Sequence, residues 1–140
     1  MKIGFALAAV VLGAFGATTV ASNLVSADDG KDLESKMGVT ASFDAKSKKV
    51  TIVLKGKESG VYVNTEYPFS CTLNGKDGGS VDKAKVTKDD AKLEDSGHAG
   101  KAKSATFSVG ADKGVTGECK LVACSESACS SPFKVPFSSN

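Results

Sequence analysis

Four cysteines are the residues of this chain best suited to chemistry, and three of them lie near its C-terminus. Cys124 and Cys129 flank four small or polar residues, 125–128, between two apolar runs, which is typical of a β-hairpin closed by a disulfide. Such a bond is either a structural staple or an exchangeable redox pair. A reactive pair needs a stabilised thiolate, and the turn carries the opposing charge of Glu126. The sequence therefore favours a structural bond.

The remaining cysteines predict a second disulfide. Cys119 and Cys124 are expected on one extended strand, where their Cα atoms would lie about 16 Å apart at roughly 3.3 Å per residue, too far for a bond. Pairing Cys124 with Cys129 leaves Cys71 for Cys119, and both are in phase with inward-facing apolar neighbours. We expect this second bond to be buried between strands or between sheets.

Other reactive side chains form weaker patterns. His98, the only histidine, lies in a glycine-rich loop without a cluster of ligands, so we expect a solvated loop residue and no metal site. The carboxylate pairs Asp89 with Asp90 and Glu94 with Asp95 are interleaved with lysines, as on a solvated face. The sequence therefore predicts no catalytic residue and no cofactor.

Aromatic residues around Pro68 suggest a contact surface. Tyr62, Tyr67 and Phe69 lie close together in the sequence and would line a shallow strip. Packing in the core or at a strand edge is the commoner fate of such residues. These three are nevertheless the predicted binding residues.

Residues 1–27 have the pattern of a cleaved signal peptide. Lys2 precedes an uncharged apolar run, residues 3–17, and small residues follow, with cleavage expected after Ala27 or alternatively after Ala21. The run of about 15 residues is shorter than the roughly 20 that span a bilayer, which makes an uncleaved anchor the weaker alternative. We expect export to the periplasm or the medium, with no stable membrane anchor after cleavage.

Composition argues against nucleic acid as a partner. The formal charge is +2, and +1 once Lys2 is removed, which provides little attraction to nucleic acid or to an anionic membrane. All 18 basic residues are lysine, and tryptophan is absent, so the residue types that most often read bases and anchor interfaces are missing. An even number of cysteines fits an oxidising compartment. A protein of unknown identity is the expected partner.

Alternating apolar and polar residues dominate from Val39 onward and indicate an all-β domain. Residues 28–37 are expected to form a flexible mature terminus and residues 38–140 a single domain. Residues 87–93 predict one helical turn with Thr87 as its N-cap. The expected strands are 39–43, 50–54, 61–63, 69–73, 105–109, 115–123 and 133–137, and 81–86 is a candidate for one further short strand. About seven short strands separated by turns predict an immunoglobulin-like β-sandwich stapled by disulfides.

The chain resembles the immunoglobulin-like amino-terminal domain of periplasmic thiol:disulfide interchange reductases, and small secreted myxobacterial-type proteins of unknown function are similar. The likeness covers residues 50–137. It is carried by the Gly-x-Tyr segment at 60–69 and by the Ala-Cys-Ser-x-Ser-x-Cys-x-x-Pro-x-x-Val-Pro tail that begins at Ala123. The resemblance implies an exchangeable disulfide between Cys124 and Cys129.

The chain also departs from that family. Ser130 and Ser131 replace the expected aromatic and proline surroundings, and Cys71 and Cys119 have no counterpart in the redox domain. The leading hypothesis is therefore an exported, non-catalytic immunoglobulin-like binding or structural module. The alternative is a periplasmic thiol-disulfide exchange domain.

Overall fold

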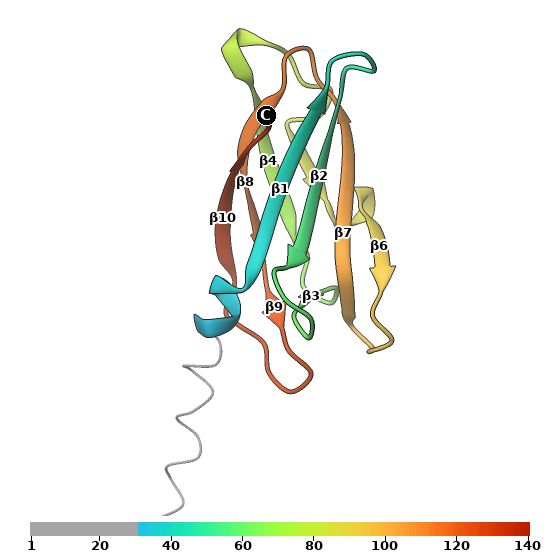
Figure 1. The fold of residues 1–140 in the computed structure, drawn as a ribbon, viewed down its shortest axis with the longest axis vertical. Helices are drawn as coiled ribbons and strands as arrows, with labels where there is room; N and C mark the ends of the chain where they lie inside the picture. The colour runs from blue at the N-terminus through green and yellow to red at the C-terminus, as the bar shows by residue number, and fades with distance from the viewer. Residues whose placement is uncertain (1–30) are drawn as a thin grey trace, which may run out of the picture.

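The computed structural model describes residues 31–140, which form two antiparallel sheets packed face to face (Figure 1). The predicted signal peptide and its cleavage sites lie outside the described residues. Two short 3-10 turns, η2 (Lys76–Gly78) and η3 (Lys88–Asp90), interrupt the strands. The strands are β1 (Met37–Asp44), β2 (Lys49–Gly56), β3 (Tyr62–Asn64), β4 (Ser70–Gly75), β5 (Lys85–Thr87), β6 (Lys92–Asp95), β7 (Lys101–Gly110), β8 (Val115–Leu121), β9 (Ala123–Cys124) and β10 (Phe133–Ser138).

The strand order confirms the predicted sandwich. One sheet has the order β1-β2-β7-β3-β9, with β6 also paired to β7, and the other has the order β10-β8-β4-β5. The series β1-β2-β7-β6 and β10-β8-β4 correspond to the ABED and GFC sheets of immunoglobulin domains. Seven principal strands therefore build the fold, and β3, β5 and β9 are short additions.

The alternation in the sequence builds the core. On β2, the inward residues Val50, Ile52 and Leu54 are fully buried. On the facing sheet, Phe69, which directly precedes β4, meets Phe107 of β7 edge to face with ring centroids 6.2 Å apart. Every second residue of a strand points to the same side, so the two sheets bury these rows against each other.

The N-terminal boundary of the domain differs from the prediction. Residues 31–35 are helical, and both Leu33 and Met37 are buried in the core, so residues 31–37 belong to the domain. Lys36 ties this segment to the turn after β2, because its ammonium contacts Asp32 at 2.9 Å and Glu58 at 3.0 Å. Between residues 31 and 140, no helix has the length and apolar character to cross a membrane.

The predicted continuous strand 115–123 is also wrong. β8 ends at Leu121, the chain turns at Val122, and β9 pairs with β3 in the opposite sheet. The alternating sequence pattern does not reveal this change of sheet. The inner faces of both sheets point into one core, so an inward residue is apolar in either sheet. Four consecutive buried residues, 121–124, mark the crossing.

The segment after η2 is less regular than predicted. The expected strand 81–86 shrinks to β5, and Val81 forms only an isolated bridge with Ala111. The predicted helical turn at 87–93 is the 3-10 turn η3, after which the chain continues as β6. Thr87 does precede this turn, and its backbone N–H donates to the Asp90 carboxylate at 2.9 Å.

Replacing Asp90 with asparagine is expected to lower stability in a pH-dependent way. Hydrogen bonds from Lys83 and from the Thr87 backbone hold the pKa of Asp90 below its ordinary value. A carboxyl group whose pKa falls on folding stabilises the fold above its unfolded pKa, and this contribution is lost as the pH falls through the folded value. The urea midpoint of Asp90→Asn should be lower than that of wild type at pH 7. The difference should shrink as the pH falls below the ordinary pKa of an aspartate and vanish once Asp90 is protonated in the folded protein. A difference that does not change with pH would contradict this assignment.

Candidate functional site at the disulfide hairpin

The first disulfide joins Cys71 of β4 to Cys119 of β8, as predicted. The two residues are direct neighbours in the β4-β8 register, so the bond links two strands of one sheet. Both cysteines are fully buried. This bond is therefore part of the core and offers no sulfur to a reagent in solution.

The second disulfide joins Cys124 to Cys129 and closes the predicted hairpin. The turn is held by further bonds besides the disulfide. The Ser125 backbone N–H donates to the Ala128 carbonyl at 2.7 Å, and the Ser130 N–H donates to the Ala123 carbonyl at 2.8 Å. The hydroxyl of Ser130 also accepts from the Ala123 N–H at 3.1 Å. The backbone thus specifies the same turn as the disulfide.

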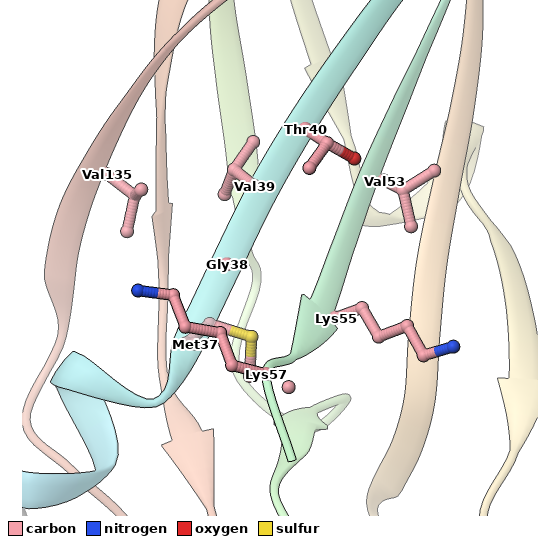
Figure 2. A pocket seen from close by; sticks show the side chains of 9 residues that line it. Met37, Gly38, Val39, Thr40, Val53, Lys55, Lys57 and Val135 are labelled. Carbon is pink, nitrogen blue, oxygen red and sulfur yellow. The ribbon is translucent and has the colours of Figure 1, made fainter.

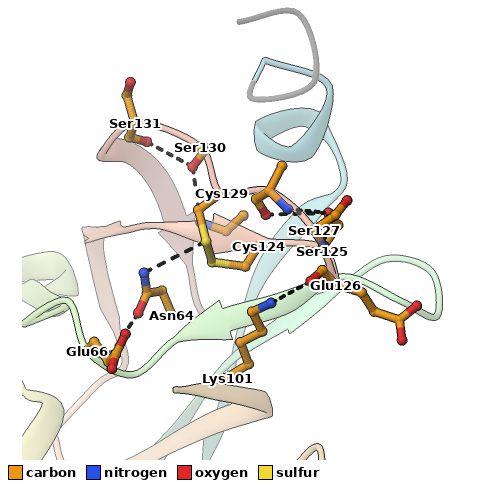
Figure 3. The surroundings of a disulfide bond; sticks show 12 residues. Asn64, Glu66, Lys101, Cys124, Ser125, Glu126, Ser127, Cys129, Ser130 and Ser131 are labelled. Carbon is orange, nitrogen blue, oxygen red and sulfur yellow. Dashed lines mark hydrogen bonds between the residues drawn. A yellow bond between two sulfur atoms is a disulfide. The ribbon is translucent and has the colours of Figure 1, made fainter. Parts of the chain in front are cut away.

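The two cysteines of the hairpin differ in exposure. Cys124 is fully buried, whereas Cys129 is exposed. The side-chain amide of Asn64 lies 4.0 Å from the sulfur of Cys129 and donates toward it (Figure 3). A nucleophile would reach the sulfur of Cys129, and bond cleavage would then leave a thiolate on buried Cys124, where charge is costly.

Segments distant in the sequence meet the hairpin turn. The Lys101 ammonium donates to the Glu126 carbonyl oxygen at 3.0 Å (Figure 3). His98 Nε2 lies 3.5 Å from Glu126 Oε1, and the His98 ring packs on Tyr62 with centroids 5.3 Å apart. Tyr62 is in turn the cross-strand neighbour of Cys124. These contacts define the hairpin-end cluster, which consists of Tyr62, Asn64, His98, Lys101, Glu126 and Cys129.

The sequence foresaw only part of this cluster. His98 lies in a loop, as expected, but it is half-buried against Tyr62 rather than fully solvated. Lys101 and Asn64 were not predicted. Their positions depend on pairing of β3 with both β7 and β9, and no local pattern in the sequence encodes that pairing.

The predicted aromatic strip does not form one surface. Tyr62 belongs to the hairpin-end cluster, and Tyr67 is half-buried against the core. Phe69 is fully buried, so it cannot contact a partner. Phe69 is buried because it is in phase with the inward residues Cys71 and Leu73, so the alternation of the strand places its ring in the core.

The acidic residues of the domain remain dispersed. Asp89, Glu94 and Asp95 are exposed, as expected for a solvated face, and Glu94 accepts a hydrogen bond from Ser104 at 3.3 Å. Within residues 31–140, no three histidine, cysteine, aspartate or glutamate side chains gather as a metal site would require. The hairpin-end cluster is therefore the candidate functional site.

The chain matches no protein-family model and no curated protein.

Proposed function

We propose that this chain is an exported, non-catalytic immunoglobulin-like binding module whose contact surface is the hairpin-end cluster. The observation that carries the proposal is that His98, from the connection between β6 and β7, and Lys101, the first residue of β7, both contact Glu126 of the hairpin turn. A surface whose side chains are already held in place loses less conformational entropy when a partner binds. Tyr62 contributes an aromatic face, which is common among residues that dominate interfaces.

Export is supported by the two disulfides. Such bonds persist in oxidising compartments, and small domains outside the cytosol use them to supplement a modest core. The pairing of all four cysteines fits this environment. The apolar leader pattern in residues 1–27 supports the same proposal.

A thiol-disulfide exchange domain is the second candidate. The observation that favours it is the exposure of Cys129. In such a reaction an incoming thiolate would attack the sulfur of Cys129, the disulfide would break, and Cys124 would leave as the thiolate. The resemblance to the reductase domains gives the same pair this role.

The reduction potential of the hairpin disulfide separates the two functions. If the bond is a staple, we expect it to resist glutathione, with a potential below roughly −300 mV. Dedicated oxidoreductases lie higher, between about −270 and −120 mV, and a value in that range would contradict the binding-module proposal. The measurement is equilibration of the folded protein with glutathione buffers, followed by thiol trapping and peptide mapping. The Cys124→Ser/Cys129→Ser variant is the control, because it removes the signal of this bond alone.

A further inference from the structure

The outer edges of the two sheets differ in their protection against pairing with another strand. Natural sheets blunt such edges with short strands, charged residues, prolines and bulges. β5 has three residues and β9 has two, β10 contains Pro136, and exposed β6 has a register shift between Glu94 and Asp95. Each of these edges carries a protective feature, and β1 is the edge that remains.

β1 is the least protected of these edges, because its only charged residue is Asp44 at its last position. It runs for eight residues, Met37–Asp44, pairs with β2 without a register shift, and contains neither lysine nor proline. Within the described part of the chain, β2 is its only strand partner, although β10 of the other sheet lies beside it. The backbone N–H and C=O groups on the side of β1 away from β2 therefore pair with no strand within residues 31–140.

The inward row of β1 is also incompletely covered. Val39, Ala41 and Phe43 point toward the core but are only half-buried. Their fully buried cross-strand partners on β2 are Leu54, Ile52 and Val50. A groove of about 410 Å³ opens at the start of β1 and is lined by residues of β1, β2 and β10, among them Val39, Val53 and Val135 (Figure 2). An added strand would cover apolar surface that the domain leaves open.

Opposite charges stand at the two ends of β1. The Lys57 side chain crosses the start of the strand, where a Cβ atom added to Gly38 would lie 3.5 Å from Lys57 Cγ (Figure 2). The Asp44 carboxylate lies at the other end and accepts from the Lys46 N–H at 2.9 Å. Neither Lys57 nor Asp44 belongs to an ion pair within residues 31–140.

We propose that two copies of this chain pair along β1, antiparallel and about a two-fold axis at Ala41. This register keeps inward residues opposite inward residues, as a sheet requires. Val39 then faces Phe43 of the second copy, an aromatic and β-branched pair of the kind that stabilises sheets. Gly38 faces Asp44 of the second copy, which brings that carboxylate to Lys57.

The added strand is a second copy of this chain, because the chain itself carries both members of each proposed contact. These are the apolar pair Val39 and Phe43 and the charged pair Lys57 and Asp44. In a two-fold interface each contact occurs twice, so a single register forms two Lys57 to Asp44 ion pairs and two apolar pairs. The result is a continuous sheet across both molecules. This inference does not depend on the function proposed for the hairpin-end cluster.

Sedimentation of the full mature chain tests the pairing. We expect wild type to pass from monomer to dimer between about 1 µM and 1 mM. Ala41→Lys should abolish the dimer, because it places two ammonium groups together at the two-fold axis. Leu93→Lys is the control for a lysine added to a different edge strand, since Leu93 is an exposed apolar residue on β6, and it should dimerise as wild type does. A monomer at all concentrations, or a dimer that survives Ala41→Lys, would overturn the proposal.

A charge swap tests the register independently of folding. Lys57→Asp and Asp44→Lys should each weaken dimerisation by about tenfold, because each single change turns two attractions into two repulsions. The double variant should recover most of the wild-type affinity. Failure of this rescue would show that Lys57 and Asp44 do not meet. Amide exchange provides a second readout, and β1 should gain protection only at concentrations where the dimer forms.

Discussion

Replacing both Cys71 and Cys119 with alanine is expected to lower the free energy of unfolding by about 4 kcal/mol. The disulfide connects residues 48 apart in the sequence, so its loss frees a long loop in the unfolded chain. Both cysteines are fully buried, and removal of their sulfur atoms also leaves a small cavity between the sheets. The two effects act in the same direction.

The hairpin disulfide provides the comparison. It connects residues only 5 apart, and its loss in Cys124→Ala/Cys129→Ala should cost about 2 kcal/mol. The hydrogen bonds between Ala123 and Ser130 should preserve the turn. Urea unfolding of both double variants against wild type gives the difference. Equal losses of stability, or a larger loss for the hairpin variant, would contradict the prediction that the Cys71–Cys119 bond stabilises the domain more than the Cys124–Cys129 bond does.

Replacing Phe69 with alanine should destabilise the domain by about 3 to 5 kcal/mol. The Phe69 ring is fully buried and packs edge to face on Phe107, so truncation opens a cavity and removes an aromatic contact. Thermal and urea unfolding would measure the loss.

Tyr62→Ala is the control for this prediction. The Tyr62 ring is only half-buried and lies in the hairpin-end cluster, so its loss should cost less stability. A Phe69→Ala protein as stable as wild type would show that Phe69 does not occupy the core. The same two variants also separate a residue of the core from a residue of the surface, because Phe69 is buried and Tyr62 is partly exposed.

Local alternation was sufficient to predict the strands that span the sandwich. The hairpin of β1 and β2 and the strands near 105–109 and 133–137 all appear, because one buried face imposes a period of two. The cysteine pairing is also correct, although one premise is wrong. Cys119 and Cys124 do not share a strand, since the chain changes sheets at Val122.

Features that depend on distant partners could not be predicted. The described helical residues, 31–35, are too few to show a periodic signal, and only tertiary packing shows that Leu33 is buried. His98 and Glu126 meet because β7 and β9 both pair with β3, which brings their flanking turns to one end of the domain. The pattern within a turn carries no information about which turn lies opposite.

The helical segment before β1 lies at the lower end of the domain, and the C-terminus lies in its upper half (Figure 1). Tension applied between these two points would run along the strands and load the ladders of β1 with β2 and of β10 with β8 in shear. Such loading strains many hydrogen bonds at once instead of opening them one after another. Even after these strands separate, the bond between Cys71 and Cys119 keeps the segment between them from extending. The cross-strand disulfide therefore sets a limit to the length that the chain can reach under force.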